Sequence, residues 1–126
     1  MRLITLAAAG LLLVPAAASA QSMNAEQFHR RATALQKKGA MAIFSRGEIR
    51  TLMNEGRAAG ERARAQRLAA VKTGGKPRYC PPPGPGNMNS DEFMKRLSAI
   101  PQGERARIDM AEATNRILAA KYPCKA

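Results

Sequence analysis

Two cysteines are the first side chains in this sequence that could do chemistry. Cys80 begins the proline-rich stretch "CPPPGPG", and Cys124 follows a tyrosine and a proline in "KYPC". In an oxidising compartment two such thiols are most simply joined as one disulfide. That bridge would close a loop of roughly 45 residues and contribute about 4 kcal/mol by the chain-entropy estimate. The alternative is a pair of free thiols, as expected in a reducing compartment.

Other groups that could support catalysis are few and scattered. His29 is the only histidine, so a histidine relay or a metal centre with two histidines is excluded. Asp91 and Glu92 fall in the first turn of a predicted helix, where negative charge favours the helix dipole. Three further acids are interspersed with arginine and are expected to be solvated: Glu104, Asp109 and Glu112. No phosphate-binding loop and no metal-ligand spacing is present, so we expect no enzyme, cofactor or metal site.

The first twenty residues predict export. Arg2 supplies a positive start, residues 3–14 form an apolar run too short to span a bilayer comfortably, and residues 18–20 (Ala-Ser-Ala) match a signal-peptidase site. We therefore expect a cleaved signal peptide over 1–20, a mature chain beginning near Gln21, and a periplasmic or secreted location. The alternative is an uncleaved N-terminal anchor. No other apolar run approaches membrane length, so no transmembrane segment is expected.

The chain is strongly basic, with 21 Lys and Arg against nine Asp and Glu and a net charge of +12. Half of the excess lies between Arg46 and Arg78, where nine bases face three acids. Such a charge attracts acidic partners by steering that weakens with salt. Five of these bases are candidate partner-binding residues: Arg50, Arg57, Arg64, Lys76 and Arg78.

The expected partner of this basic segment is an acidic protein, an anionic lipid headgroup or the cell-wall polymer. Nucleic acid is not expected, because the chain is predicted to be exported and has only three Phe and two Tyr to stack on bases. The alternative is a solvated helix face, on which Glu61 pairs with Arg57 and Arg64 at helical spacing.

The elements that position these residues are predicted to be helices. Three helix starts share one pattern, in which a polar N-cap is followed three residues later by Glu or Gln and is flanked by an apolar pair. These N-cap pairs are Asn24 with Gln27, Ser45 with Glu48, and Asn89 with Glu92. We predict four helices over residues 25–38, 46–72, 90–99 and 102–121.

Residues 21–126 are therefore expected to form a single all-α domain of four helices. Residues 73–88 form a proline-rich linker, since proline excludes helix. The disulfide would tie this linker to the end of the last helix, so that the two C-terminal helices form a stapled hairpin. The apolar stripe of the second helix shrinks from large residues, such as Ile49, Leu52 and Met53, to alanines and glycines. Its far end is therefore expected to be weakly held.

The C-terminal half resembles a known family. The order "YCPPPG", a helix, "IPQGER", an alanine-rich helix and "KYPC" is similar to the C-terminal half of Tai-type and related Rap-type immunity proteins, over about residues 79–124. The resemblance implies a small exported helical protein that binds and inhibits a peptidoglycan-cleaving amidase delivered by a type VI secretion system. Some members act as dimers, so a homodimer is a further expectation. Cys80 and Cys124 correspond as structural residues, whereas residues 21–78 lack the additional cysteines of many members.

Two functions follow as expectations. The first is an exported binding protein of the immunity type, with the basic helix and the proline loop as its contact surface. The alternative is a basic envelope-associated structural or stress protein that binds anionic surfaces without a unique protein partner.

Overall fold

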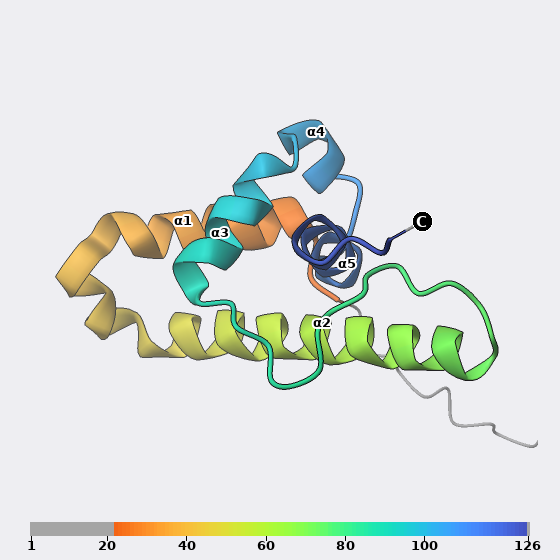
Figure 1. The fold of residues 1–126 in the computed structure, drawn as a ribbon. Coiled ribbons are helices and arrows are strands. Elements are labelled where there is room, and N and C mark those ends of the chain that lie inside the picture. The colour runs from red at the N-terminus through yellow and green to blue at the C-terminus, as the bar shows by residue number, and fades with distance from the viewer. Residues whose placement is uncertain (1–21, 126) are drawn as a thin grey trace, which may run out of the picture.

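Helices form most of the computed structural model, which describes residues 22–125 (Figure 1). Within that range no strand is present, and the all-α prediction is confirmed. The predicted signal peptide 1–20 and the predicted start at Gln21 lie outside the described residues. The elements are α1 (Ala25–Lys38), a 3-10 helix η1 (Gly39–Ser45), α2 (Arg46–Lys72), α3 (Ser90–Ala99), the single turn α4 (Gln102–Arg105) and α5 (Met110–Lys121).

The long helix α2 is the base on which the other helices lie. Figure 1 shows α1 and α3 above its N-terminal half and α5, viewed nearly end-on, above its middle. The core lies between these four helices, and its larger buried side chains are Phe28, Leu52, Met94, Leu97, Met110 and Ile117. No helix among residues 22–125 has the combined length and apolar character that crossing a membrane would need.

Two of the three predicted caps are present. The side chain of Asn24 accepts hydrogen bonds from the backbone N–H groups of Glu26 and Gln27 at 3.0 and 3.1 Å, and so begins α1. The side chain of Asn89 accepts one from the N–H of Glu92 at 2.8 Å and begins α3. These bonds satisfy donors that a helix start would otherwise leave free.

The third predicted cap, at Ser45, is wrong. Ser45 is the last residue of η1 and makes no side-chain cap bond to α2. Its hydroxyl instead accepts a hydrogen bond from Lys38 Nζ at 2.9 Å, across the turn between α1 and α2. Glu48 binds Arg31 of α1 with both carboxylate oxygens, each at 2.6 Å. Contacts between elements have therefore replaced the local capping box.

The single predicted helix over 102–121 is also wrong, because the chain breaks it between α4 and α5. The N-terminal segment pairs with this break: Ala25 N donates to the carbonyl of Ile108 at 2.9 Å, and Met110 N donates to the carbonyl of Met23 at 2.7 Å. In a continuous helix over 102–121, the carbonyl of Ile108 and the N–H of Met110 would instead bond within that helix. The carboxylate of Asp109 accepts from the N–H of Glu112 at 2.8 Å and begins α5 afresh.

Small residues determine how α2 and α5 pack. Ala59 and Ala63 on α2 are buried, and α2 makes its most extensive helix contact with α5. Small side chains let the two backbones approach closely. Further along α2, Leu68 and Val71 remain exposed. The helix is thus held in its middle, and its last turns carry uncovered apolar surface.

The predicted disulfide between Cys80 and Cys124 is confirmed, with Cα atoms 4.9 Å apart. Beside it, Cys80 N donates to the carbonyl of Tyr122 at 2.8 Å. Lys121 Nζ reaches both carboxylate oxygens of Glu92 at 2.8 and 2.9 Å, which joins α5 to α3. The disulfide and this ion pair together close the predicted C-terminal hairpin.

Candidate functional site

The proline-rich loop forms one wall of a cleft of about 600 Å³, which we call the proline cleft. The opposite walls come from α2 and α5, and the lining residues are Arg64, Arg67, Tyr79, residues 81–86, Leu118 and Tyr122. Tyr79 is buried, and the guanidinium carbon of Arg67 lies 5.5 Å from the centre of its ring. Proline rings fix the backbone of the loop, and the disulfide anchors its beginning. The cleft therefore has a rigid wall.

Arg67 is a residue of this cleft that the sequence analysis missed. Its Nε atom is buried and has no hydrogen-bond partner among residues 22–125. Its guanidinium is held over Tyr79, where the cation faces the negative side of the ring. The sequence offered no signal for this role, because Arg67 lies outside the seven-residue spacing of the other arginines and Tyr79 is in a different element.

The five predicted partner-binding bases do not form one site. Arg50, Arg57 and Arg64 are exposed along α2, with Arg64 at the proline cleft. Lys76 is exposed in the linker, whereas Arg78 forms a bidentate ion pair with Glu112, including Nη2 to Oε1 at 2.8 Å. This ion pair occupies Arg78 within the molecule.

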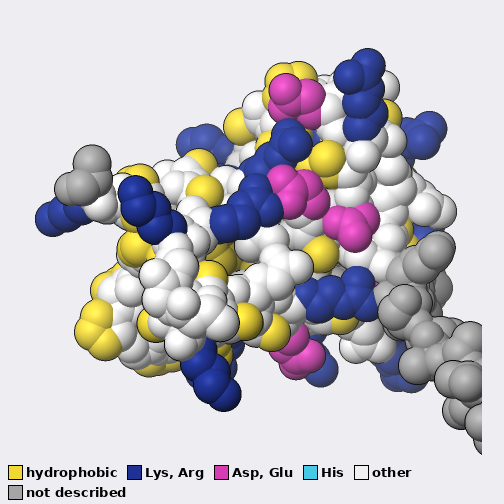
Figure 2. Space-filling model, turned by 90° about the vertical axis from the view of Figure 1, so that its right-hand side faces the viewer, with side chains coloured by type: hydrophobic (Ala, Val, Ile, Leu, Met, Phe, Trp, Pro, Cys, Tyr) yellow, Lys and Arg dark blue, Asp and Glu magenta, His cyan; other side chains and the backbone are white. Residues whose placement is uncertain are grey.

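The solvated-face alternative predicted pairing of Glu61 with Arg57 and Arg64. Among residues 22–125, Glu61 makes no ion pair with either arginine, so both guanidinium groups face solvent without that acid. Figure 2 shows lysine and arginine side chains spread over the face of the molecule that it displays, with fewer acids between them. Arg50, Arg57 and Arg64 thus form a row of exposed bases along α2 that is available to an anionic partner.

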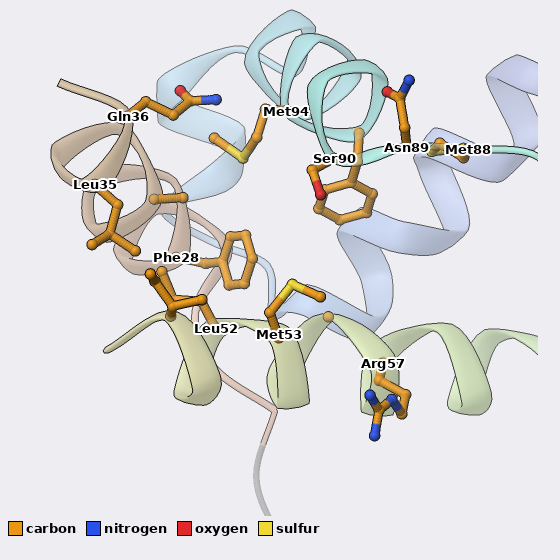
Figure 3. Close-up of a pocket in the computed structure, with 14 residues that line it drawn as sticks. Phe28, Leu35, Gln36, Leu52, Met53, Arg57, Met88, Asn89, Ser90 and Met94 are labelled. Atoms are coloured by element: carbon orange, nitrogen blue, oxygen red, sulfur yellow. The ribbon is translucent and has the colours of Figure 1, made fainter. Parts of the chain in front are cut away.

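A second concavity is an apolar groove of about 440 Å³ between α1, α2 and α3 (Figure 3). Three methionines line it, Met53, Met88 and Met94, and methionine adapts readily to ligands of different shape. Among the described residues, Arg57 is the only charged one that lines it. Met53 and Ile49 were expected on the apolar stripe of α2, but both stay exposed because no described element covers them.

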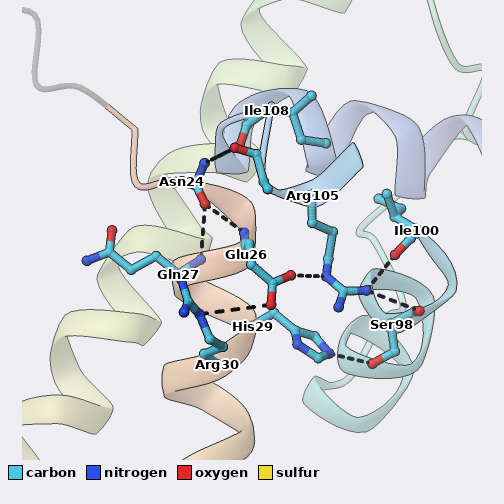
Figure 4. Close-up of polar contacts among 10 residues, drawn as sticks. Asn24, Glu26, Gln27, His29, Arg30, Ser98, Ile100, Arg105 and Ile108 are labelled. Atoms are coloured by element: carbon cyan, nitrogen blue, oxygen red, sulfur yellow. Dashed lines mark hydrogen bonds and ion pairs between the residues drawn. The ribbon is translucent and has the colours of Figure 1, made fainter. Parts of the chain in front are cut away.

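A buried polar cluster joins α1 to the region around α4 (Figure 4). Arg105 Nε donates to a carboxylate oxygen of Glu26 at 2.7 Å, and its Nη1 donates to the carbonyls of Ser98 and Ile100. Both charged residues of this ion pair are buried. The cluster opens onto neither of the two concavities, so its role is to hold elements together.

His29 lies at the edge of this cluster and is partly buried. Its Nε2 is 2.9 Å from the hydroxyl of Ser98. Partial burial lowers the pKa of His29, and the positive charge of Arg105 lowers it further, so the ring is neutral at pH 7. No group of three or more potential metal ligands is found within residues 22–125.

The acids that were expected to be solvated have structural partners. Asp109 caps α5, and Arg116 contacts both Glu104 and Glu112. Hydrogen bonds from Arg78 lower the pKa of Glu112, and those from Arg116 lower it further. The Glu112 carboxylate therefore stays ionised at neutral pH, and it anchors both Arg78 and Arg116.

Comparisons with known proteins complete the description of the site. No family model, no curated protein and no solved structure matches this chain.

Proposed function

We propose that the protein is an exported, non-enzymatic binding protein of the immunity type, which inhibits a peptidoglycan-cleaving hydrolase. The observation that carries this proposal is the rigid proline loop held beside Arg64 and Arg67. The resemblance over residues 79–124 supports the same function, because its two cysteines anchor that loop.

The chemistry of the proline cleft suits a protein partner. Tyrosine and arginine are the residue types that most often dominate binding energy at protein interfaces. A loop fixed by prolines and a disulfide loses little conformational entropy on binding. The bases along α2 would speed association with an acidic surface and select against basic ones. The partner in this proposal is an acidic hydrolase whose cleft receives the proline loop.

The test begins with the oxidised protein as bait for periplasmic and secreted extracts, with mass spectrometry of what is retained at physiological salt. Stoichiometric recovery of one cell-wall hydrolase is expected, followed by inhibition of that enzyme in a peptidoglycan-cleavage assay. Arg64→Glu should raise the concentration needed for half inhibition by about tenfold or more, as for loss of a charge in an interface.

Arg107→Glu is the matched control, since Arg107 is exposed on the turn between α4 and α5, outside both concavities. It makes the same change of charge and should leave inhibition near that of the parent protein. Equal inhibition by the Arg64→Glu and parent proteins at low salt would show that the proline cleft does not contribute to binding the hydrolase. Recovery of no hydrolase at all would count against the inhibitor function itself.

The second candidate is a basic envelope-associated protein that binds anionic surfaces. The row of exposed bases on α2, without pairing to Glu61 in the described structure, favours it. Binding to cell-wall sacculi or anionic vesicles that disappears at moderate salt would support this function. Absence of binding to either at low salt would contradict it.

A further inference from the structure

The turn between α1 and α2 exposes an unusual amount of apolar surface. The seven-residue segment η1 contains five consecutive apolar residues, 40–44, and none of the seven is buried. The side chains of Met41, Ile43 and Phe44 are 63, 55 and 80% exposed, and together we call them the apolar tip. Single exposed apolar residues are common, but three within four residues form a patch of the kind that marks an interaction site.

The segment η1, which carries the apolar tip, lies at one end of the molecule, where the chain reverses between α1 and α2 (Figure 1). Gly39 makes the reversal with φ of +53°, which glycine adopts without strain. The bond from Lys38 Nζ to Ser45 Oγ ties the two ends of the turn together. None of the three tip residues lines either concavity, so the tip is a projecting knob.

Positive charge flanks the apolar tip on both sides. No acid occurs in residues 27–47, whereas five bases do: Arg30, Arg31, Lys37, Lys38 and Arg46. The nearest following acid, Glu48, and Arg31 neutralise each other through two hydrogen bonds, so Lys37, Lys38 and Arg46 carry the positive charge nearest the tip. The amino end of α2, which carries the positive end of a helix dipole, also lies here. The surroundings of the tip therefore favour an anionic partner.

We propose that the apolar tip inserts into the interfacial region of an anionic lipid bilayer. Met41, Ile43 and Phe44 would enter the boundary between headgroups and acyl chains, while Lys37, Lys38 and Arg46 contact the lipid phosphates. Stable attachment to a membrane surface generally needs two signals, and an apolar insertion with adjacent bases supplies both. A projecting knob with bases on both flanks fits a broad anionic surface, so we favour lipid over an acidic protein.

This inference rests on the second candidate function and names the part of the protein surface that contacts the membrane. The first test is sedimentation of the chain from Gln21 onward with vesicles, because residues 1–20 are apolar and would bind lipid by themselves. Vesicles with about one third phosphatidylglycerol should bind it at least about tenfold more tightly than pure phosphatidylcholine, in line with a few lysine contacts. Equal binding to both, or binding to neither at low salt, would overturn the proposal.

The variant that tests the tip replaces Met41, Ile43 and Phe44 with serine. Because these side chains are exposed, the fold should survive, which circular dichroism would verify. Leu68→Ser with Val71→Ser is the matched control, since these side chains are also 47 and 54% exposed but lie near the far end of α2. Binding to anionic vesicles should fall by about tenfold or more in the tip variant and stay unchanged in the control.

A second measurement reports insertion directly. The chain contains no tryptophan, so Phe44→Trp places a single fluorescent reporter at the tip and Val71→Trp places one far from it. With anionic vesicles, emission of the first variant should shift to shorter wavelength and be quenched by brominated lipid, while emission of the second stays unchanged. Unshifted emission from a vesicle-bound Phe44→Trp protein would overturn insertion of the tip.

Two outcomes would distinguish lipid insertion of the apolar tip from the anionic-surface function and from the inhibitor function. If Arg57→Glu with Arg64→Glu abolishes vesicle binding while the tip variant binds normally, the anionic-surface function stands and the tip has no part in it. If the tip variant loses inhibition of a recovered hydrolase and no vesicle binding occurs, the tip is a protein contact and the lipid proposal is wrong.

Discussion

Arg105 joins α1 to carbonyl groups at the C-terminal end of α3. It is buried, pairs with the buried Glu26, and bonds to the carbonyls of Ser98 and Ile100. An ion pair of this kind gains little over an apolar pair, but removal of one partner leaves an uncompensated charge inside the protein.

We therefore expect Arg105→Met to lower the free energy of unfolding by about 3 kcal/mol, because Glu26 would stay buried with only the longer contact to Arg30, at 3.9 Å, to offset its charge. Urea unfolding followed by circular dichroism would measure this. Arg107→Met, an exposed neighbour, should change stability by less than about 0.5 kcal/mol. The double variant Glu26→Leu/Arg105→Met should recover much of the loss. No recovery would mean that the carbonyl contacts matter more than the charge.

The bidentate pair of Arg78 with Glu112 predicts a pH dependence. Because hydrogen bonding to Arg78 lowers the pKa of Glu112 in the folded protein, the pair stabilises the fold above the ordinary glutamate pKa of about 4.3. This stability is lost as the pH falls from that value through the lower pKa of the folded state. Arg78→Gln should therefore reduce the drop in melting temperature between pH 7 and pH 3.

Lys76→Gln is the control for this comparison, since Lys76 is exposed and makes no ion pair within the described part of the chain. It removes one positive charge from the same linker. If both variants flatten the pH profile equally, general charge reduction is responsible and the specific pair is not.

At the scale of elements, the start of α5 could have been predicted. "IDMAEA" repeats the pattern of the other starts, with Asp109 as N-cap, Glu112 three residues on, and Ile108 and Ala113 flanking. The absence of the cap bonds at Ser45 could not have been predicted from the local pattern. It depends on two residues of α1, since Arg31 bonds to Glu48 and Lys38 bonds to the hydroxyl of Ser45. The local pattern therefore predicted where α2 begins, but it predicts cap bonds only where no long-range partner competes for the same side chains.

Asp109→Ala should lower the free energy of unfolding by about 1 kcal/mol through loss of the N-cap bond. Asp109→Asn should keep most of that stability, because asparagine can accept the same bond. Thermal unfolding of the two variants would measure the difference. Asp91→Ala is a suitable control, since Asp91 is a first-turn acid of α3 that does not occupy the N-cap position. A loss at Asp91 as large as that at Asp109 would show that helix-dipole charge, and not capping, is being measured.

The contact of α2 with α5 should be intolerant of larger side chains. Ala63 is fully buried, so Ala63→Leu would force the helices apart and cost at least about 1–3 kcal/mol. Ala65→Leu, two residues on and exposed, should be near neutral or slightly stabilising because leucine is a good helix former. Denaturant midpoints of the two variants give the comparison, and equal midpoints would contradict close packing at Ala63.

At the scale of the whole molecule, the disulfide is the main covalent constraint on the described fold. Cys80→Ser with Cys124→Ser should lower the free energy of unfolding by about 4 kcal/mol, as for a loop of this length. The reduced parent protein should match the double variant in a urea titration. A loss of less than about 1 kcal/mol would show that the Lys121–Glu92 pair and the core already hold the hairpin closed.

The sequence predicted the bounds of α1, α2 and α3 and the disulfide, because caps, glycines and prolines are local signals. It did not predict the apolar groove, since Ile49 and Met53 belong to the same stripe as the buried Leu52 and only tertiary packing separates them. The sequence pattern also predicted one continuous helix through Arg105, whereas α4 ends at Arg105 and α5 begins at Met110. The groove and the helix break were not predicted because both depend on contacts with elements that are distant in the sequence.

The pairing of residues 23–25 with residues 108–110 also governs the order in which the fold can be completed. The hydroxyl of Ser22 accepts from the N–H of Ala111, 89 residues later in the chain. A ribosome and an export channel both release the N-terminal partner first, so the apolar faces of α1 and α2 stay uncovered until α5 has emerged. During that interval the nascent chain is most exposed to aggregation and proteolysis, and a chaperone that covers α2 would have its greatest effect then.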